Sequence, residues 1–159
     1  MRALGLVVVA AVTLVAAGSG SPAAATEGAS GCAVSRPGGE PVPGRSSFNF
    51  GNRRIAVALP PRATFVAVRD GRPGGAWVQR DGTIRTKVGW WRARGELRIA
   101  GRRLDRRSAP LRADVGPLSW TSQGVFVPSE LFFPSVGCWR ITATAGGARL
   151  DAVVRVVRR

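Results

Sequence analysis

The sequence predicts an all-β protein, an antiparallel sandwich built from short strands, and three observations lead there. From Phe48 onward, short apolar runs alternate with turn residues at regular spacing, which is typical of β-sandwiches and barrels. No stretch beyond residue 25 shows a sustained 3.6-residue apolar period with helix caps. The last two runs, 138–145 and 148–157, alternate apolar and polar side chains with period two, as a half-buried antiparallel pair does.

The chain begins with the features of a secretory signal peptide. Arg2 is the only early charge, and it precedes an apolar run over residues 3–17 and then a segment of small residues. The run is shorter than the roughly 20 residues that a membrane-spanning helix needs, so we expect no transmembrane span in the mature chain. Ala23-Ala24-Ala25 fits the small-residue rule for cleavage, which places the signal peptide at 1–25.

A second interpretation of this region is lipoprotein processing before Cys32, which would then carry the lipid. Against it stand Ala29, where such sites usually have leucine, and the long gap between the apolar run and Cys32. We therefore expect a secreted or envelope-associated protein, with a lipid anchor at Cys32 as the minority alternative.

The rest of the chain divides into an arm and one domain. Residues 26–47 carry Pro37, Pro41 and Pro43 outside any apolar period, which predicts a Gly/Pro-rich N-terminal arm on the surface. Residues 48–159 are then the β-sandwich domain, and the mature chain is long enough for one domain with its own core.

Turn residues divide this domain into strands. Pro60-Pro61 ends the first strand, because proline cannot donate to a ladder. Asp81-Gly82 and Gly146-Gly147 fit two-residue hairpin turns, which need positive φ angles. The strands are expected at residues 53–59, 63–69, 76–80, 83–91, 95–100, 111–115, 124–128, 138–145 and 148–157.

The start of the penultimate strand makes the predicted sandwich immunoglobulin-like. In such folds this strand follows a turn and begins near an aromatic residue that anchors the corner. Here Gly137 supplies the turn, and Trp139 shares its parity with Ile141 and Ala143, so we expect Trp139 to point inward. The Cys…Trp…Cys spacing of antibody domains is absent.

Cys32 and Cys138 are the only cysteines. In an exported chain an even count favours a disulfide, here one that closes a loop of about 106 residues. Cys138 has the opposite parity to Trp139, so it is expected to face outward, toward the arm that carries Cys32. The alternative is two independent residues, with Cys138 buried as a small apolar side chain.

Three segments resemble a set of uncharacterised exported bacterial proteins. They are residues 87–105, 109–115 and 131–156, with the motifs WWR…GRRLD and FP..GCW. The resemblance implies an exported β-rich domain and supplies no catalytic residue. Proteins of that set often carry glutamate where this chain has Arg140, and a Phe-rich final strand where it reads LDAVVRVV.

The composition argues against catalysis. The chain has no histidine and no tyrosine, and a disulfide would occupy both cysteines, so the commonest bases, thiol nucleophiles and imidazole metal ligands are missing. We expect no enzyme, no metal and no cofactor. The carboxylates are scattered beside arginines or in turns; they include Asp81, Glu96, Asp105, Asp114, Glu130 and Asp151.

The stretch WWRARGELRIAGRRLDRR, residues 90–107, is the best candidate for a binding surface. If one strand continued across Gly95, arginines would line one face, with a tryptophan at its end that could stack on a sugar or base. The plainer interpretation is a solvated sheet face whose arginine stems cover apolar surface. The predicted polyanion-binding residues are Trp90, Arg92, Arg94, Arg98, Arg102 and Arg103.

These observations predict an exported, non-enzymatic module that binds or supports structure at the bacterial cell envelope. The formal net charge of +15 favours an anionic envelope polymer as partner, or another envelope protein. Export argues against nucleic acid, which rests on charge alone. The alternative is an accessory envelope hydrolase or an enzyme inhibitor that uses the scattered carboxylates.

Overall fold

The structure is a computed structural model, and it describes residues 31–69, 75–117, 119–121 and 124–159. The predicted signal peptide, 1–25, lies outside the described residues. In the described part, short strands follow one another with a single turn of 3-10 helix, η1 (Pro61–Ala63). The strands are β1 (Phe50–Gly51), β2 (Ile55–Val57), β3 (Thr64–Val68), β4 (Ala76–Val78), β5 (Ile84–Arg92), β6 (Arg98–Arg103), β7 (Arg112–Val115), β8 (Ser119–Thr121), β9 (Gly124–Phe133), β10 (Gly137–Ala145) and β11 (Ala148–Arg158).

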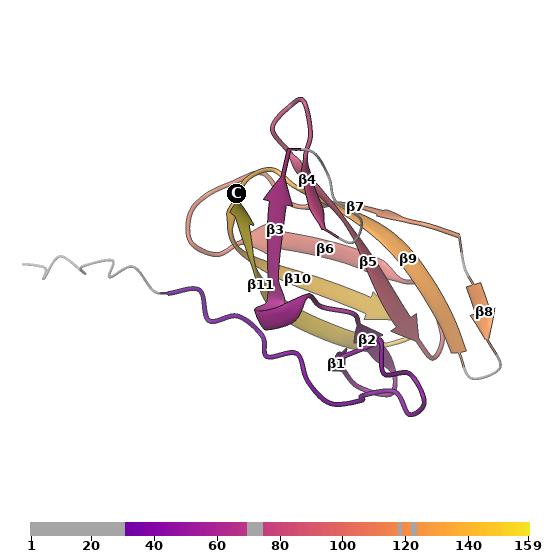
Figure 1. Cartoon of the computed structure of the whole chain (residues 1–159). Coiled ribbons are helices and arrows are strands. Elements are labelled where there is room, and N and C mark those ends of the chain that lie inside the picture. Colours follow the sequence, from indigo (N-terminus) through magenta and orange to yellow (C-terminus); the bar gives the residue numbers. More distant parts are fainter. Residues whose placement is uncertain (1–30, 70–74, 118, 122–123) are drawn as a thin grey trace, which may run out of the picture.

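The strands form two layers that face each other (Figure 1). One layer pairs β2 with β5, β5 with β9, and β9 with β7 and β8. The other pairs β6 with β10 and β10 with β11. Named A to G in chain order, β2, β5, β6, β7, β9, β10 and β11 give the layers A-B-E-D and C-F-G, the strand order of a constant-type immunoglobulin sandwich. The predicted fold class is therefore confirmed.

One side of the sandwich departs from the purely antiparallel expectation. β3 runs parallel to β11, and β4 runs parallel to β3 while it pairs antiparallel with β5. Pro60 and η1 turn the chain away from the first layer before β3 begins, so β3 reaches the last strand in the same direction. β4 thereby links the two layers along this side.

The core lies between the layers, and Trp139 stands at its centre. The Trp139 side chain is 0% exposed, as predicted from its parity. Its ring meets Phe133 of the opposite layer edge-on, with 5.5 Å between ring centroids, and Phe133 also contacts Phe65 of β3. The indole Nε1–H donates to the Ser135 carbonyl at 3.1 Å, so the polar edge of the ring is satisfied in the turn before β10.

The main error in the strand boundaries concerns β9, which runs through Pro128 to Phe133 where the sequence predicts an end at residue 128. A strand tolerates proline where no ladder bond needs its missing donor. The Pro128 carbonyl accepts the Gly116 N–H at 2.8 Å, beyond the end of β7. The N–H and C=O of one strand residue point to the same side of the strand. The Pro128 nitrogen, which carries no hydrogen, therefore faces the region beyond the end of β7 and does not face β5.

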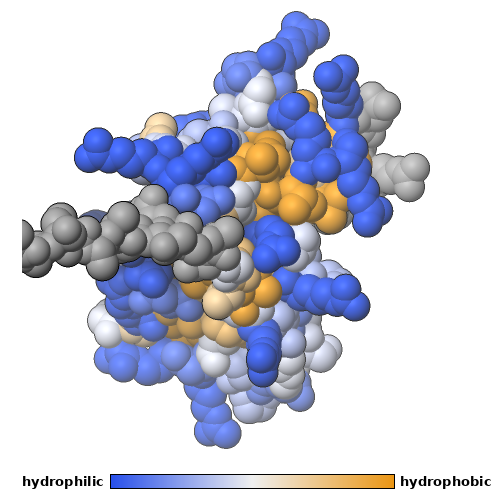
Figure 2. Space-filling model, turned by 90° about the vertical axis from the view of Figure 1, so that its left-hand side faces the viewer, coloured by the Kyte–Doolittle hydropathy of each residue, from blue (hydrophilic) through white to orange (hydrophobic). Residues whose placement is uncertain are grey.

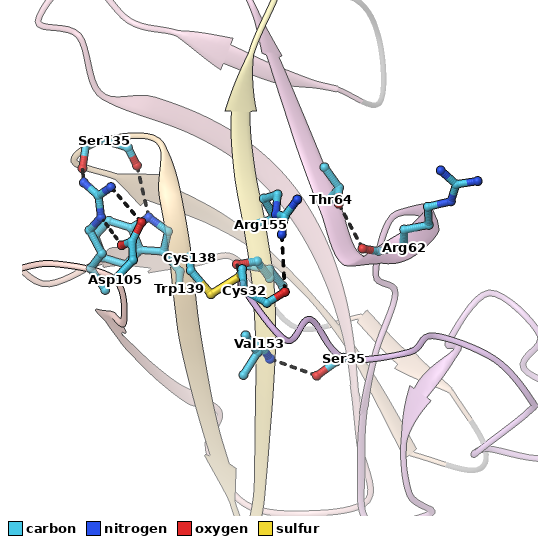
Figure 3. Close-up of a disulfide and its surroundings, with 12 residues drawn as sticks. Cys32, Ser35, Arg62, Thr64, Asp105, Ser135, Cys138, Trp139, Val153 and Arg155 are labelled. Carbon is cyan, nitrogen blue, oxygen red and sulfur yellow. Dashed lines mark hydrogen bonds and ion pairs between the residues drawn. A yellow bond between two sulfur atoms is a disulfide. The ribbon is translucent and has the colours of Figure 1, made fainter. Parts of the chain in front are cut away.

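The arm crosses the outside of the second layer, and the predicted disulfide between Cys32 and Cys138 is present (Figure 3). Beside it, the Ser35 N–H donates to the Val153 carbonyl at 2.8 Å, and the Val153 N–H donates to Ser35 Oγ at 2.9 Å. β3 pairs with β11 only from Arg155 onward, so Ser35 continues the pairing along the same edge.

A second contact holds the arm further along. Val42 and Phe48 pack on Trp91 and Ala56, on the outer face of the first layer. The Phe48 and Trp91 ring centroids lie 6.1 Å apart. The arm is thus anchored on both layers, by the disulfide at one point and by this apolar cluster at the other.

Candidate functional site

The predicted arginine stripe is not one continuous strand. β5 ends at Arg92 and β6 begins at Arg98, and between them Gly95 has φ +78° and lies in a turn. The alternation of faces that the prediction assumed is therefore interrupted, and the six predicted residues are distributed over four environments.

Trp90 and Arg92 belong to the interior, which corrects the prediction that they contact a ligand. Both lie on the inward row of β5, and their residues are 1% and 5% exposed. The Trp90 Nε1–H donates to Ser129 Oγ at 2.9 Å, and that hydroxyl donates to the Val88 carbonyl. The Trp90 ring is thus a core group and is not available to stack on a sugar or base.

Arg103 is a structural residue. Its side chain is 5% exposed, donates to both carboxylate oxygens of Asp105 at 2.6 and 3.1 Å, and donates to Ser135 Oγ at 2.8 Å. The Arg103 hydrogen bonds hold the pKa of Asp105 below its usual value. The guanidinium also covers Gly137, where a Cβ would stand 2.4 Å from Nη2. It fixes the turn before Trp139.

Arg98 and Arg102 remain exposed, on the outer side of β6. The ladders place Arg140 of β10 directly beside Arg102, and place Thr144 between Arg98 and Arg149 of β11. Arg140 lies on the outward row of β10 between the buried Trp139 and Ile141. We call the four residues Arg98, Arg102, Arg140 and Arg149 the arginine face.

Two members of the arginine face have acidic partners and two do not. Arg98 contacts Glu96 at 3.2 Å, and Arg149 contacts Asp151 at 2.8 Å. Arg149 and Thr142 hold the pKa of Asp151 below its usual value, with a weaker contribution from the charge of Arg140. Within the described residues, no carboxylate lies within ion-pair distance of Arg102 or Arg140. Like charges directly opposite on neighbouring strands repel, so an anion bound between Arg102 and Arg140 would relieve this repulsion.

Part of the arginine face was visible in the sequence. The period-two pattern of the final hairpin already places Arg140 and Arg149 on its polar side. What sequence reasoning missed is that β6 pairs with β10, because a local pattern does not specify which distant strand lies alongside.

Arg94 lies at the end of the sandwich, in the turn between β5 and β6. This turn meets the β10–β11 hairpin backbone to backbone: a Cβ at Gly95 would stand 2.2 Å from the Gly146 nitrogen. A Cβ at Gly146 would in turn stand 2.7 Å from the Arg94 carbonyl oxygen and from Arg94 Cγ, and both glycines have positive φ angles. Two glycines therefore allow the turns of opposite layers to close on each other.

Replacing Gly95 with alanine is expected to lower the free energy of unfolding by about 3 kcal/mol, from the left-handed backbone and the overpacking together. Gly82→Ala is the matched control, because Gly82 also has a positive φ but no heavy atom within 4 Å of the added Cβ. It should cost about 1 kcal/mol. Denaturant titration of both variants measures the difference, and equal losses would show that the Gly95–Gly146 contact is unimportant.

Five carboxylates of the described residues form separate ion pairs with arginine, while Asp81 accepts two hydrogen bonds from Thr83. The Glu130 carboxylate accepts two hydrogen bonds from the Arg85 guanidinium in a bidentate ion pair, and Arg112 forms an ion pair with Asp114. No group of three or more potential metal ligands occurs in the described part of the chain. The described residues hold five ion pairs, and the whole sequence has 24 basic against 9 acidic residues, so much of the positive charge is left without a carboxylate partner. Figure 2 shows long hydrophilic side chains around apolar surface on one side of the molecule.

The outer face of the other layer differs in character. It holds a hollow of about 490 Å³, with Gly89, Phe126 and Pro128 among its lining residues and Lys87 and Glu130 at its margin. Gly89 has no side chain that could fill this hollow, and a Cβ there would stand 2.8 Å from the Phe126 ring. The two outer faces of the sandwich are therefore chemically distinct.

No protein-family model and no curated protein matches the chain. Among solved structures, the filamin domain of Lin-41 is similar, with 10% sequence identity and a TM-score of 0.38, over 64% of this chain and 90% of that one. In the described residues, no helix has the length and apolar character needed to cross a membrane.

Proposed function

We propose that this protein is an exported, non-enzymatic binding module of the bacterial cell envelope, and that its arginine face contacts an anionic envelope polymer. The observation that carries the proposal is the direct pairing of Arg102 and Arg140 across β6 and β10, without a carboxylate partner among the described residues. Two guanidinium groups side by side offer several N–H donors to phosphate or carboxylate oxygens.

Charge supports the same partner at longer range. A formal net charge of +15 attracts polyanions from solution and speeds their association. The strands under the arginine face hold the backbone of its four arginines in fixed rows. Binding therefore costs less conformational entropy than it would for a flexible segment. Most of the described carboxylates are held in ion pairs with arginine, which favours a binding role over the alternative of a hydrolase.

The test reverses the two central charges. Arg102→Glu with Arg140→Glu should weaken binding of inorganic polyphosphate at least tenfold, because two charge-assisted contacts become repulsive. The slope of log K against log salt should also fall by roughly 1.5, since each lost phosphate contact removes about 0.7 to 0.9 from it. Fluorescence anisotropy with labelled polyphosphate measures both quantities.

Arg69→Glu with Arg80→Glu is the matched control, because both residues are exposed and the change in net charge is the same. This variant should lose much less affinity. If the two double variants weaken binding equally, the attraction comes from net charge alone and the arginine face is an ordinary solvated surface. Parallel titration with polyglutamate shows whether phosphate or carboxylate polymers bind better.

A further inference from the structure

A second group of arginines lies at the end of the sandwich, apart from the arginine face. It consists of Arg53 and Arg54, just before β2, and Arg94, in the turn between β5 and β6. All three residues are exposed. We call them the corner arginines; the sequence predicted a binding role for Arg94 but not for Arg53 and Arg54, which lie about 40 residues before it.

Backbone and side-chain contacts bring these residues together. The Ala93 N–H donates to the Arg54 carbonyl at 3.0 Å, which extends the pairing of Ile55 with Arg92 by one step. Arg53 precedes Arg54 in the turn that the Asn52 N–H closes on the Ile55 carbonyl, so it lies next to Arg54 along the chain. The Arg54 guanidinium reaches across to the other layer and donates to the Gly146 carbonyl at 3.4 Å.

The corner is held by a turn and by the glycine contact. Asn52 Oδ1 accepts the N–H groups of Arg54 at 2.8 Å and of Ile55 at 3.2 Å, and the Asn52 N–H donates to the Ile55 carbonyl. On the other side, the Gly95–Gly146 contact fixes the turn that carries Arg94. The backbones from which the three side chains project are therefore fixed before any ligand arrives.

The corner is open to solvent, and the nearest carboxylate along the chain, Glu96, is paired with Arg98. Gly147 has no side chain, and the only heavy atom of the described residues near its Cβ position is Arg54 Nη2, at 3.7 Å. None of the corner arginines forms an ion pair with a described carboxylate. Adjacent like charges without compensation cost stability, and such local conflicts are expected at functional sites.

We propose that the corner arginines form a second anion site, specific for a small anion with more than one negative charge, of the phosphomonoester or pyrophosphate class. Arginines that project from two separate turns, with Arg54 and Arg94 both reaching Gly146, suit a tetrahedral group with several charged oxygens better than a planar, singly charged carboxylate. The site shares no residue with the arginine face, so it stands independently of the proposed function.

The experiment titrates the protein with inorganic pyrophosphate and follows backbone amide signals by NMR. The Gly146 and Gly147 signals should shift, and Arg54→Gln with Arg94→Gln should weaken binding at least tenfold. Arg102→Gln with Arg140→Gln should leave pyrophosphate affinity within about twofold of wild type. Malonate should bind more weakly than pyrophosphate to the wild-type protein, because its two charges sit on planar groups.

Each contrary result is informative. The corner site is overturned if wild-type protein does not bind pyrophosphate, or if Arg54→Gln with Arg94→Gln binds it normally. An equal loss in Arg69→Gln with Arg80→Gln also overturns it, because the effect would then be one of net charge. If polyphosphate binding depends on the arginine face while pyrophosphate binding depends on neither set, the proposed function survives and the corner site fails.

Discussion

Replacing Trp139 with alanine is expected to lower the free energy of unfolding by about 4 kcal/mol, in the range observed for large aromatic residues removed from a core. The side chain is fully buried, and its ring packs edge-on against Phe133 of the opposite layer. The substitution leaves a cavity between the layers and removes the hydrogen bond from the indole to the Ser135 carbonyl. Urea titration followed by circular dichroism measures the loss.

Two further variants make this result specific. Trp139→Phe keeps an aromatic ring against Phe133 and should lose only part of the stability, through a smaller cavity and the missing hydrogen bond. Trp77→Ala is the control for the chemistry of the change, because Trp77 is a half-buried tryptophan whose ring lies under the Arg85 guanidinium. A loss of less than 1 kcal/mol at Trp139, or an equal loss at Trp77, would contradict a central role for Trp139.

Trp139 shows what a local pattern can predict. The final hairpin alternates over its whole length, and its turn residues Gly146 and Gly147 have the positive φ angles that such a turn needs. Because a strand has only two faces, parity together with one certain turn decides which side chains enter the core. The same logic correctly placed Cys138 on the outward row, opposite Arg155.

The arginine stripe shows where such reasoning fails. Parity carries over only as long as the strand continues, and Gly95 ends it by turning the chain from one layer to the other. The turn leaves Trp90 and Arg92 with the interior of the first layer and moves Arg98 and Arg102 to the outside of the second. Which residues then gather on a surface depends on the pairing of distant strands, and the sequence gives no sign that Arg54 and Arg94 both reach Gly146.

Removal of the disulfide has the other large expected effect. Cys32→Ser with Cys138→Ser should lower the free energy of unfolding by about 4 to 5 kcal/mol, because the bond joins residues 106 positions apart and restricts the unfolded chain. Thermal and denaturant unfolding of the oxidised protein and of this variant measure the change. Intact mass spectrometry of the purified protein tests the disulfide and the predicted cleavage together: we expect a chain that starts at Thr26 and is two hydrogen atoms lighter than its reduced form.

Because other contacts also hold the arm, the loss of global stability can be measured separately from local opening of the arm. Without the disulfide, residues near Cys32 are held by the two hydrogen bonds between Ser35 and Val153, while Val42 and Phe48 stay packed on Trp91. The Val153 amide should then exchange through local opening of the arm, much faster than the Ile141 amide in the covered strand β10. If Val153 and Ile141 lose protection equally, the bond acts only on the unfolded chain. If the variant keeps wild-type stability, the disulfide does not fasten the arm to the sandwich.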